Sequence, residues 1–249
     1  MIEDTVLLGS VVSLFVGLAT GVGALPVLVT KQVSDRLLDV MLGFSAGIML
    51  AATSFSLIIP AIALNGPLVA AVGIVVGAFV LHLIDRFIPH LHPTMGAEGP
   101  PSKLSKVWLF VIAITIHNFP EGLAVGVSFG SGNVADGFVV AMAIGLQNMP
   151  EGLAVALPLL REGYSRRRSV WYGTLTGLVE PVGGVLGVGL VAIFHPILPW
   201  ALAFAAGAML FVVSDEIIPE SHRKGFEREA TFGLIAGFVI MMFLDNLFT

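Results

Sequence analysis

The sequence predicts an all-α integral membrane protein, with eight transmembrane helices in a 3+2+3 inverted repeat. Hydrophobic residues make up 56% of the 249 residues and charged residues only 12%, whereas about 25% of the residues of soluble domains are charged. Apolar stretches long enough to cross a bilayer recur along the chain, and two segments occur twice. Because little sequence remains for loops, we expect one membrane domain over residues 1–249.

Each predicted span is an apolar stretch of about 20 residues, the length that crosses a bilayer. The stretches lie at about residues 5–30, 37–62, 66–88, 106–130, 137–160, 169–193, 198–219 and 230–248. The first opens with Glu3 and Asp4 instead of a basic stretch, and no small-residue cleavage motif follows it. We therefore expect it to stay as the first helix and not to be removed as a signal peptide.

All 12 Lys and Arg residues fall in alternate loops. These are the loops around Lys31 and Arg36 and at residues 86–106, 161–168 and 223–228. Lys and Arg in short loops mark the cytoplasmic side, so we expect a multi-pass protein of the cell (inner) membrane with both termini outside the cytoplasm. The basic residues are few and explained by this topology, so nucleic-acid binding has little support.

Two internal repeats indicate the inverted arrangement. The first, at a spacing of 160 residues, aligns Phe44, Ala46, Gly47, Met49, Leu50 and Ser54 with Phe204, Ala206, Gly207, Met209, Leu210 and Ser214. The second aligns HNFPEGLAV at residues 117–125 with QNMPEGLAV at residues 147–155. Chance recurrence of small residues is an alternative only for the first. Both pairs fall on spans of opposite direction, which predicts repeat A at about 5–88, central helices at about 106–160 and repeat B at about 169–248.

Three glutamates, Glu121, Glu151 and Glu180, lie near the middle of predicted spans. An ionised carboxylate at the bilayer centre costs about 2.5–3.5 kcal/mol on insertion scales, so together they cost on the order of 10 kcal/mol. Some interaction must compensate for this cost, and a bound cation would do so. For any single glutamate, a structural role as a satisfied hydrogen-bonding group is the alternative.

Further ligand-type side chains surround the two central glutamates. Each glutamate has such a residue one helical turn earlier and an amide three residues earlier: His117 and Asn118 before Glu121, and Gln147 and Asn148 before Glu151. Pro120 and Pro150 lack an N–H group and allow a kink, and irregular backbone at this depth survives only where it lines protein or a water-filled cavity. The central helices are therefore predicted to carry a metal site.

The mixture of ligand types favours a borderline divalent metal. The chain has no cysteine, which leaves imidazole, carboxylate, amide and thioether ligands. This set suits a borderline divalent metal such as Zn²⁺ better than Mg²⁺, which prefers oxygen ligands and retains its waters. Met49, predicted at the same depth, would add a thioether if it faces inward, and an ordinary core position is its alternative.

A second polar cluster is predicted at the cytoplasmic ends of the third and seventh helices. We interpret it as a candidate exit path for the ion, and solvated helix ends are the alternative for several members. Its residues are Asp85, His90, His92, Asp215, Glu216 and His222.

At residues 117–122 and 147–152 the sequence resembles the ZIP (Zrt- and Irt-like) metal transporters, in particular their short prokaryotic members. Residues 41–47, Glu180-Pro181 and residues 217–222 extend the resemblance over essentially the whole chain. It implies uptake of zinc, iron, manganese or cadmium towards the cytoplasm, a homodimer, and an elevator-like movement of the central helices.

The resemblance also implies a site for two metal ions. One ion would be held by Met49, His117, Glu121, Gln147 and Glu151, and the other by Asn118, Glu121, Asn148, Glu151 and Glu180. Gln147 departs from the His that many members have at this position, and an amide is a weaker ligand than imidazole.

Two other functions stay open from the residues. One is an intramembrane metal-dependent hydrolase, although the His-Glu-x-x-His signature is absent and no separate general base is evident, so we predict that the protein is not an enzyme. The other is a metal-selective channel that uses the same site without closing either face.

Overall fold

The computed structural model describes residues 2–30 and 32–248, with side chains described from residue 4. Lys31, part of one predicted basic loop, lies outside the described residues. The elements are α1 Ile2–Ala24, η1 Leu25–Leu28, α2 Asp35–Ala52, η2 Thr53–Ile58, α3 Ile59–Phe87, β1 His90–His92, β2 Gly96–Glu98, α4 Lys106–Gly130, α5 Val134–Arg161, α6 Arg166–Gly177, α7 Glu180–Ile193, η3 His195–Ile197, α8 Leu198–Val212, η4 Val213–Ile217, α9 Ile218–Ser221 and α10 Glu227–Phe248.

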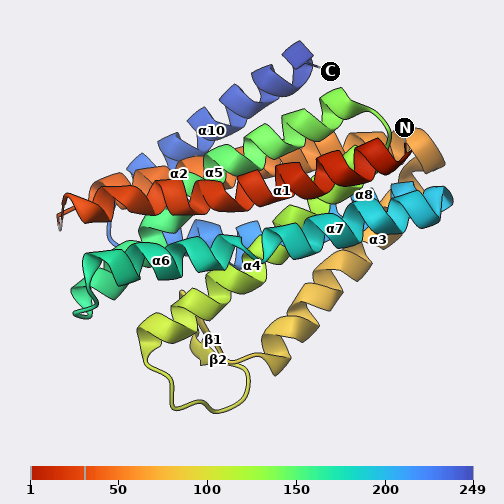
Figure 1. The fold of residues 1–249 in the computed structure, drawn as a ribbon. Coiled ribbons are helices and arrows are strands. Elements are labelled where there is room, and N and C mark those ends of the chain that lie inside the picture. The colour runs from red at the N-terminus through yellow and green to blue at the C-terminus, as the bar shows by residue number, and fades with distance from the viewer. Residues whose placement is uncertain (1, 31, 249) are drawn as a thin grey trace.

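Within the described residues, seven helical stretches are long and apolar enough to cross a membrane. The predicted spans 37–62 and 66–88 form one of them, a stretch of 53 residues from Asp35 to Phe87. Asn65 and Gly66 interrupt it with non-helical backbone, and Gly66 has a φ of +81°, which glycine adopts without steric cost. Figure 1 shows the chain turning back beyond α2, so that α3 runs towards β1.

Two further details differ from the sequence prediction. The predicted span 169–193 is divided into α6 and α7, because the helix breaks just before Glu180. The segment after α3, expected to be a loop, contains an antiparallel hairpin in which His90 pairs with Glu98. Gly96, the first residue of β2, follows the turn with a φ of +87°, which glycine adopts without steric cost. This hairpin is a small exception to the all-α class.

The helices pack in four main pairs: α2 with α10, α3 with α8, α4 with α7 and α1 with α5. The spans of α4 and α5 are the most buried, at 72%, whereas the spans that contain α3 and α10 are each 22% buried. Exposed apolar side chains such as Phe79 and Phe243 cover the outer helices, as expected for surfaces that face lipid. Polar residues on α4 and α5 are thereby kept away from the hydrocarbon.

Both ends of the chain lie at the same end of the bundle, opposite the α5–α6 turn (Figure 1). Ion pairs join the basic segments at the opposite end: Arg161 to Asp35 at 3.4 Å, Arg36 to Glu229 at 3.2 Å and Lys224 to Asp39 at 3.9 Å. The described basic segments are therefore gathered at one end of the molecule. We refer to this as the basic end.

Candidate metal centre

The central helices and the start of α7 bring the predicted ligands into one buried site. Glu121, Glu151 and Glu180 are fully buried, as are the amide side chains of Asn118, Gln147 and Asn148, and His117 is 1% exposed. The missing side chain at Gly122 allows this close arrangement, because a Cβ there would collide with the backbone of Glu180. Gly122 therefore allows the start of α7, with Glu180, to pack closely against α4.

Each of the three glutamates is held by one of its oxygen atoms. Gln147 Nε2 donates to Glu121 Oε1 at 2.5 Å, and Asn148 Nδ2 donates to Glu180 Oε1 at 2.7 Å. The hydroxyl of Ser45, on α2, lies 3.1 Å from Glu151 Oε1 and can donate to it. These contacts fix the carboxylates in orientation and leave their second oxygens unused.

The unused atoms form a set of potential metal ligands. The Oε2 atoms of Glu121, Glu151 and Glu180 have no hydrogen-bond partner among the described residues, and neither do Gln147 Oε1, Asn148 Oδ1 and the Asn118 amide group. Buried acceptors without partners are costly. Carboxylate and amide oxygens together with imidazole nitrogen are ligands for divalent cations, so an ion bound here would remove that cost.

Asn148 and Ser45 also tie the site to the surrounding helices. Asn148 Nδ2 lies 2.9 Å from the carbonyl oxygen of Val16 on α1, and the Ser45 hydroxyl lies 3.1 Å from the carbonyl oxygen of Gln147. The sequence prediction missed Ser45 as a site residue. Its spacing of four residues from Met49 places both on one face of α2, and this signal could have identified it.

His117 contacts a residue that the sequence had placed in the exit cluster. Its Nε2 atom lies 2.6 Å from Glu216 Oε1, and Glu216 is 3% exposed. Ligand atoms of Asp85, His90 and Glu216 also lie within 4.8 Å of one another. Glu216 therefore joins the two predicted clusters. It sits in η4, a wider helical turn that changes the direction in which side chains point.

The other predicted exit residues have different surroundings. His92 Nε2 lies 3.4 Å from Asp215 Oδ2, and His90 Nε2 lies 3.7 Å from Glu98 Oε2. Both histidines are buried, and their strand β1 packs against α4. His222 instead contacts the carbonyl oxygen of Ile218 at 2.8 Å, within its own helical turn. The structure therefore brings His90 and His92 to the cluster and leaves His222 outside it.

Met49 is fully buried and belongs to the main hydrophobic cluster, as does Met209. The described contacts therefore give Met49 a core environment. A role as a thioether ligand stays a prediction.

The fold and the site together define a multi-pass helical membrane protein with a buried, carboxylate-rich centre suited to a divalent transition metal. The family model described as ZIP Zinc transporter matches residues 100–245. The chain belongs to this family, which confirms the resemblance inferred from residues 117–122 and 147–152.

Similar proteins cover almost the whole chain. Zinc transporter GufA of Myxococcus xanthus is 49% identical, over 95% of this chain and 97% of that protein. Zinc transporter ZIPB of Bordetella bronchiseptica is 46% identical, over 92% of this chain and 77% of that protein. Zinc transporter ZIP11 of Homo sapiens is 38% identical, over 91% of this chain and 93% of that protein. Membership of a transporter family confirms the prediction that the protein is not an enzyme.

Replacing Ser45 by Ala should raise the KM for zinc roughly tenfold, because a hydrogen bond to a charged group contributes about 1.5–3 kcal/mol. The maximal rate should change much less, since Ser45 positions Glu151 and does not replace it. Zinc uptake into proteoliposomes over a range of concentrations measures both quantities. Ser54→Ala is the matched control, because the Ser54 hydroxyl donates only within its own helix, to the Leu50 carbonyl. Equal KM values for the two variants would contradict this role.

Proposed function

We propose that this protein carries a divalent transition-metal ion, zinc above all, across the membrane through the buried site on α4, α5 and α7. The observation that carries the proposal is the group of buried carboxylates with unpartnered oxygens, Glu121, Glu151 and Glu180. Similar proteins named zinc transporters support the choice of ion. Cd²⁺, Fe²⁺ and Mn²⁺ accept the same ligand types and are proposed as further substrates.

Two ions are proposed to share the site, with Glu121 and Glu151 between them. The ligand set with Asn118, Asn148 and Glu180 is supported by unpartnered oxygens on all five of its members. In the set with Met49, His117 and Gln147, the imidazole can bind an ion through Nδ1, which is buried without a hydrogen-bond partner among the described residues, while its Nε2 stays 2.6 Å from Glu216 Oε1. Glu216 would then orient the His117 ring and link the metal centre to the exit cluster.

The transmembrane arrangement is proposed to be eight helices in an inverted 3+2+3 repeat. The break at Asn65 and Gly66 supports two spans within the 53-residue stretch, because a straight helix of that length would be about 80 Å long in a hydrocarbon core of about 30 Å. The packing pairs are also consistent with a twofold relation, which exchanges α2·α10 with α8·α3 and α1·α5 with α7·α4. The wide turns η2 and η4 occupy equivalent positions in the two repeats.

The basic end is proposed to face the cytoplasm, with both termini outside and the ion leaving past Glu216, Asp85 and His90. Single cysteines test this orientation directly, because the natural chain has none. In intact cells, a membrane-impermeant maleimide should label Ala135→Cys and not Glu162→Cys. Both residues are exposed and lie at opposite ends of α5. The reverse pattern would invert the proposed topology.

Transport itself is tested by uptake of radioactive zinc into proteoliposomes. Protein-containing vesicles should accumulate zinc with saturation, and unlabelled Cd²⁺ should compete strongly while Mg²⁺ competes weakly. Uptake equal to that of protein-free vesicles would reject the proposal.

A channel is the second candidate: ohmic single-channel currents would favour it, whereas saturating flux with strong temperature dependence favours the carrier. The homodimer and elevator-like movement implied by the family resemblance stay proposals.

A further inference from the structure

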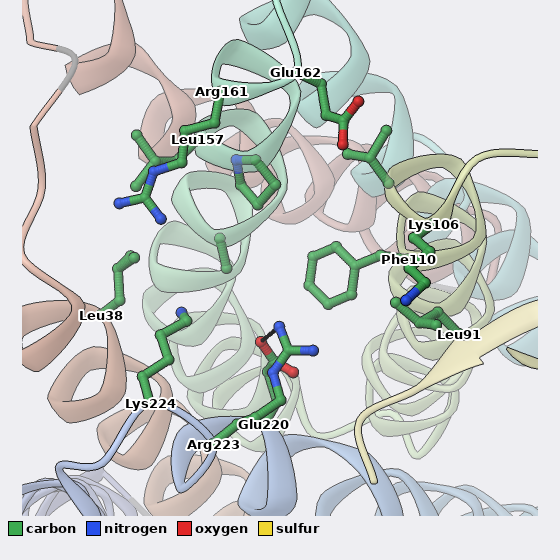
Figure 2. Close-up of a pocket in the computed structure, with 13 residues that line it drawn as sticks. Leu38, Leu91, Lys106, Phe110, Leu157, Arg161, Glu162, Glu220, Arg223 and Lys224 are labelled. Carbon is green, nitrogen blue, oxygen red and sulfur yellow. Dashed lines mark hydrogen bonds and ion pairs between the residues drawn. The ribbon is translucent and has the colours of Figure 1, made fainter. Parts of the chain in front are cut away.

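A cavity of about 370 Å³ lies at the basic end, lined by α2, β1, α4, α5 and the end of α9 (Figure 2). Its charged lining residues are Lys106, Arg161, Arg223 and Lys224, opposed by Glu162 and Glu220. Basic groups therefore outnumber acidic ones, and the local potential favours an anion over a metal cation. This separates the cavity from the carboxylate-rich metal centre.

Most of these basic groups keep free hydrogen-bonding capacity. Charge-assisted hydrogen bonds have typical lengths of about 2.7–2.9 Å, but Arg161 lies 3.4 Å from Asp35 and Lys224 lies 3.9 Å from Asp39. No described acidic residue lies within ion-pairing distance of Lys106. A guanidinium carries five N–H donors and an ammonium three. Arg161, Lys224 and Lys106 can therefore donate to an added anionic group.

Apolar side chains form the rest of the wall. Leu38, Leu91, Phe110 and Leu157 line the same cavity. Figure 2 shows Arg161 and Lys224 near Leu38, with Lys106 beside Phe110 and Leu91. A free inorganic anion has no hydrocarbon portion to pack against this apolar wall. An amphiphile with an anionic group and a hydrocarbon portion would match both parts.

Aromatic residues place the cavity at the depth of lipid headgroups. Trp108 Nε1 donates to the Tyr164 hydroxyl at 2.8 Å, and the Trp108 ring packs edge-on against Tyr172. Trp and Tyr concentrate at membrane–water interfaces. Trp108 lies two residues after Lys106, and Tyr164 lies three residues after Arg161, so the cations of the cavity sit at this interface.

We propose that this cavity binds the headgroup of an anionic phospholipid from the adjoining leaflet. The phosphate is held by Arg161 and Lys224, which lie on one side of the cavity, and Lys106 on the opposite wall adds to the positive potential. The start of an acyl chain lies along Phe110 and the leucines. Basic pockets between transmembrane helices are suited to such headgroups. Residues of α2, α4, α5 and the end of α9 line the cavity. The bound lipid therefore contacts both α4 and α5, which carry the metal site, and the neighbouring helices α2 and α9.

The test is lipid binding to the purified, metal-free protein in neutral detergent, measured by native mass spectrometry. The probes are phosphatidylglycerol and phosphatidylcholine with identical acyl chains, and inorganic phosphate. Wild type should bind phosphatidylglycerol on the order of tenfold more tightly than phosphatidylcholine. The double variant Lys106→Gln, Arg161→Gln should lose about tenfold or more in affinity for phosphatidylglycerol, because each basic group near the surface contributes about 1 kcal/mol.

The matched control is Arg167→Gln, Arg168→Gln, which removes two exposed charges at the same end but outside the cavity. It should bind phosphatidylglycerol as wild type does. Equal binding of the two lipids, an unchanged affinity in the Lys106 and Arg161 variant, an equal loss in the control, or displacement of the lipid by inorganic phosphate would each overturn the proposal. The readout contains no metal, so its result is independent of zinc transport.

Discussion

The double variant Glu121→Gln, Glu151→Gln should reduce zinc uptake into proteoliposomes to the level of protein-free vesicles. Both carboxylates belong to each proposed ligand set, and a neutral amide is a much weaker ligand. Changes to groups that only support a ligand cost about 10–100-fold in metal affinity or activity, so loss of two central ligands should cost more than about 100-fold. Gln keeps the size of the side chain, which limits packing effects.

The same variant should remain folded, so its loss of transport can be assigned to the missing metal ligands and not to unfolding. An ionised carboxylate at mid-membrane costs about 2.5–3.5 kcal/mol on insertion scales. Removal of two such charges should therefore give the metal-free variant a melting temperature equal to or above that of metal-free wild type. Size-exclusion elution and thermal melting measure this. Glu162→Gln, an exposed residue at the end of α5, is the control and should transport normally. Uptake by the double variant within twofold of wild type would show that the site is elsewhere.

Gly152→Ala should lower the free energy of unfolding by about 1–3 kcal/mol, the usual range for overpacking. A Cβ at Gly152 would collide with the carbonyl oxygen of Thr20 on α1, and one at Gly23 would collide with the backbone of Met149 on α5. These are collisions with backbone, which no change of rotamer can relieve. α1 and α5 must therefore separate, and the displacement of Gln147 and Glu151 should also reduce zinc uptake severalfold.

Gly145→Ala is the matched control, because it lies on the same helix with open space around its Cβ position. Ala is favoured over Gly in a helix interior by roughly 0.5–1 kcal/mol, so this variant should melt at the wild-type temperature or slightly above it. Thermal melting in one detergent, combined with zinc uptake, compares the two. Similar melting temperatures for both variants would contradict the proposed close approach of α1 and α5.

Several features of the fold and of the candidate site could be predicted from the sequence. The span from Lys106 to Gly130 agrees closely with the predicted 106–130, because backbone polar groups in lipid must be satisfied within each helix. The grouping of Glu121 with Glu151 follows from equal depth on neighbouring helices, and the family was recognisable from its doubled motif. These signals are local, and each depends on residues close together in the chain.

Contacts between segments far apart in the chain could not be predicted from the sequence. The Ser45 hydroxyl meets Glu151 across 106 positions of sequence, and His117 meets Glu216. Such contacts depend on the rotation and tilt of each helix, which packing against neighbouring helices sets.

The sequence by itself determined the membrane class, most of the spans, the family and the carboxylates at the centre, because a lipid solvent imposes strong length and composition rules on each segment. Only the tertiary structure decided that Glu216 contacts His117, that the hairpin with His90 and His92 packs against α4 with both histidines buried, and that basic and apolar side chains line a cavity at one end of the bundle. The physical reason is that these features arise where helices meet, and close packing between helices selects which faces touch.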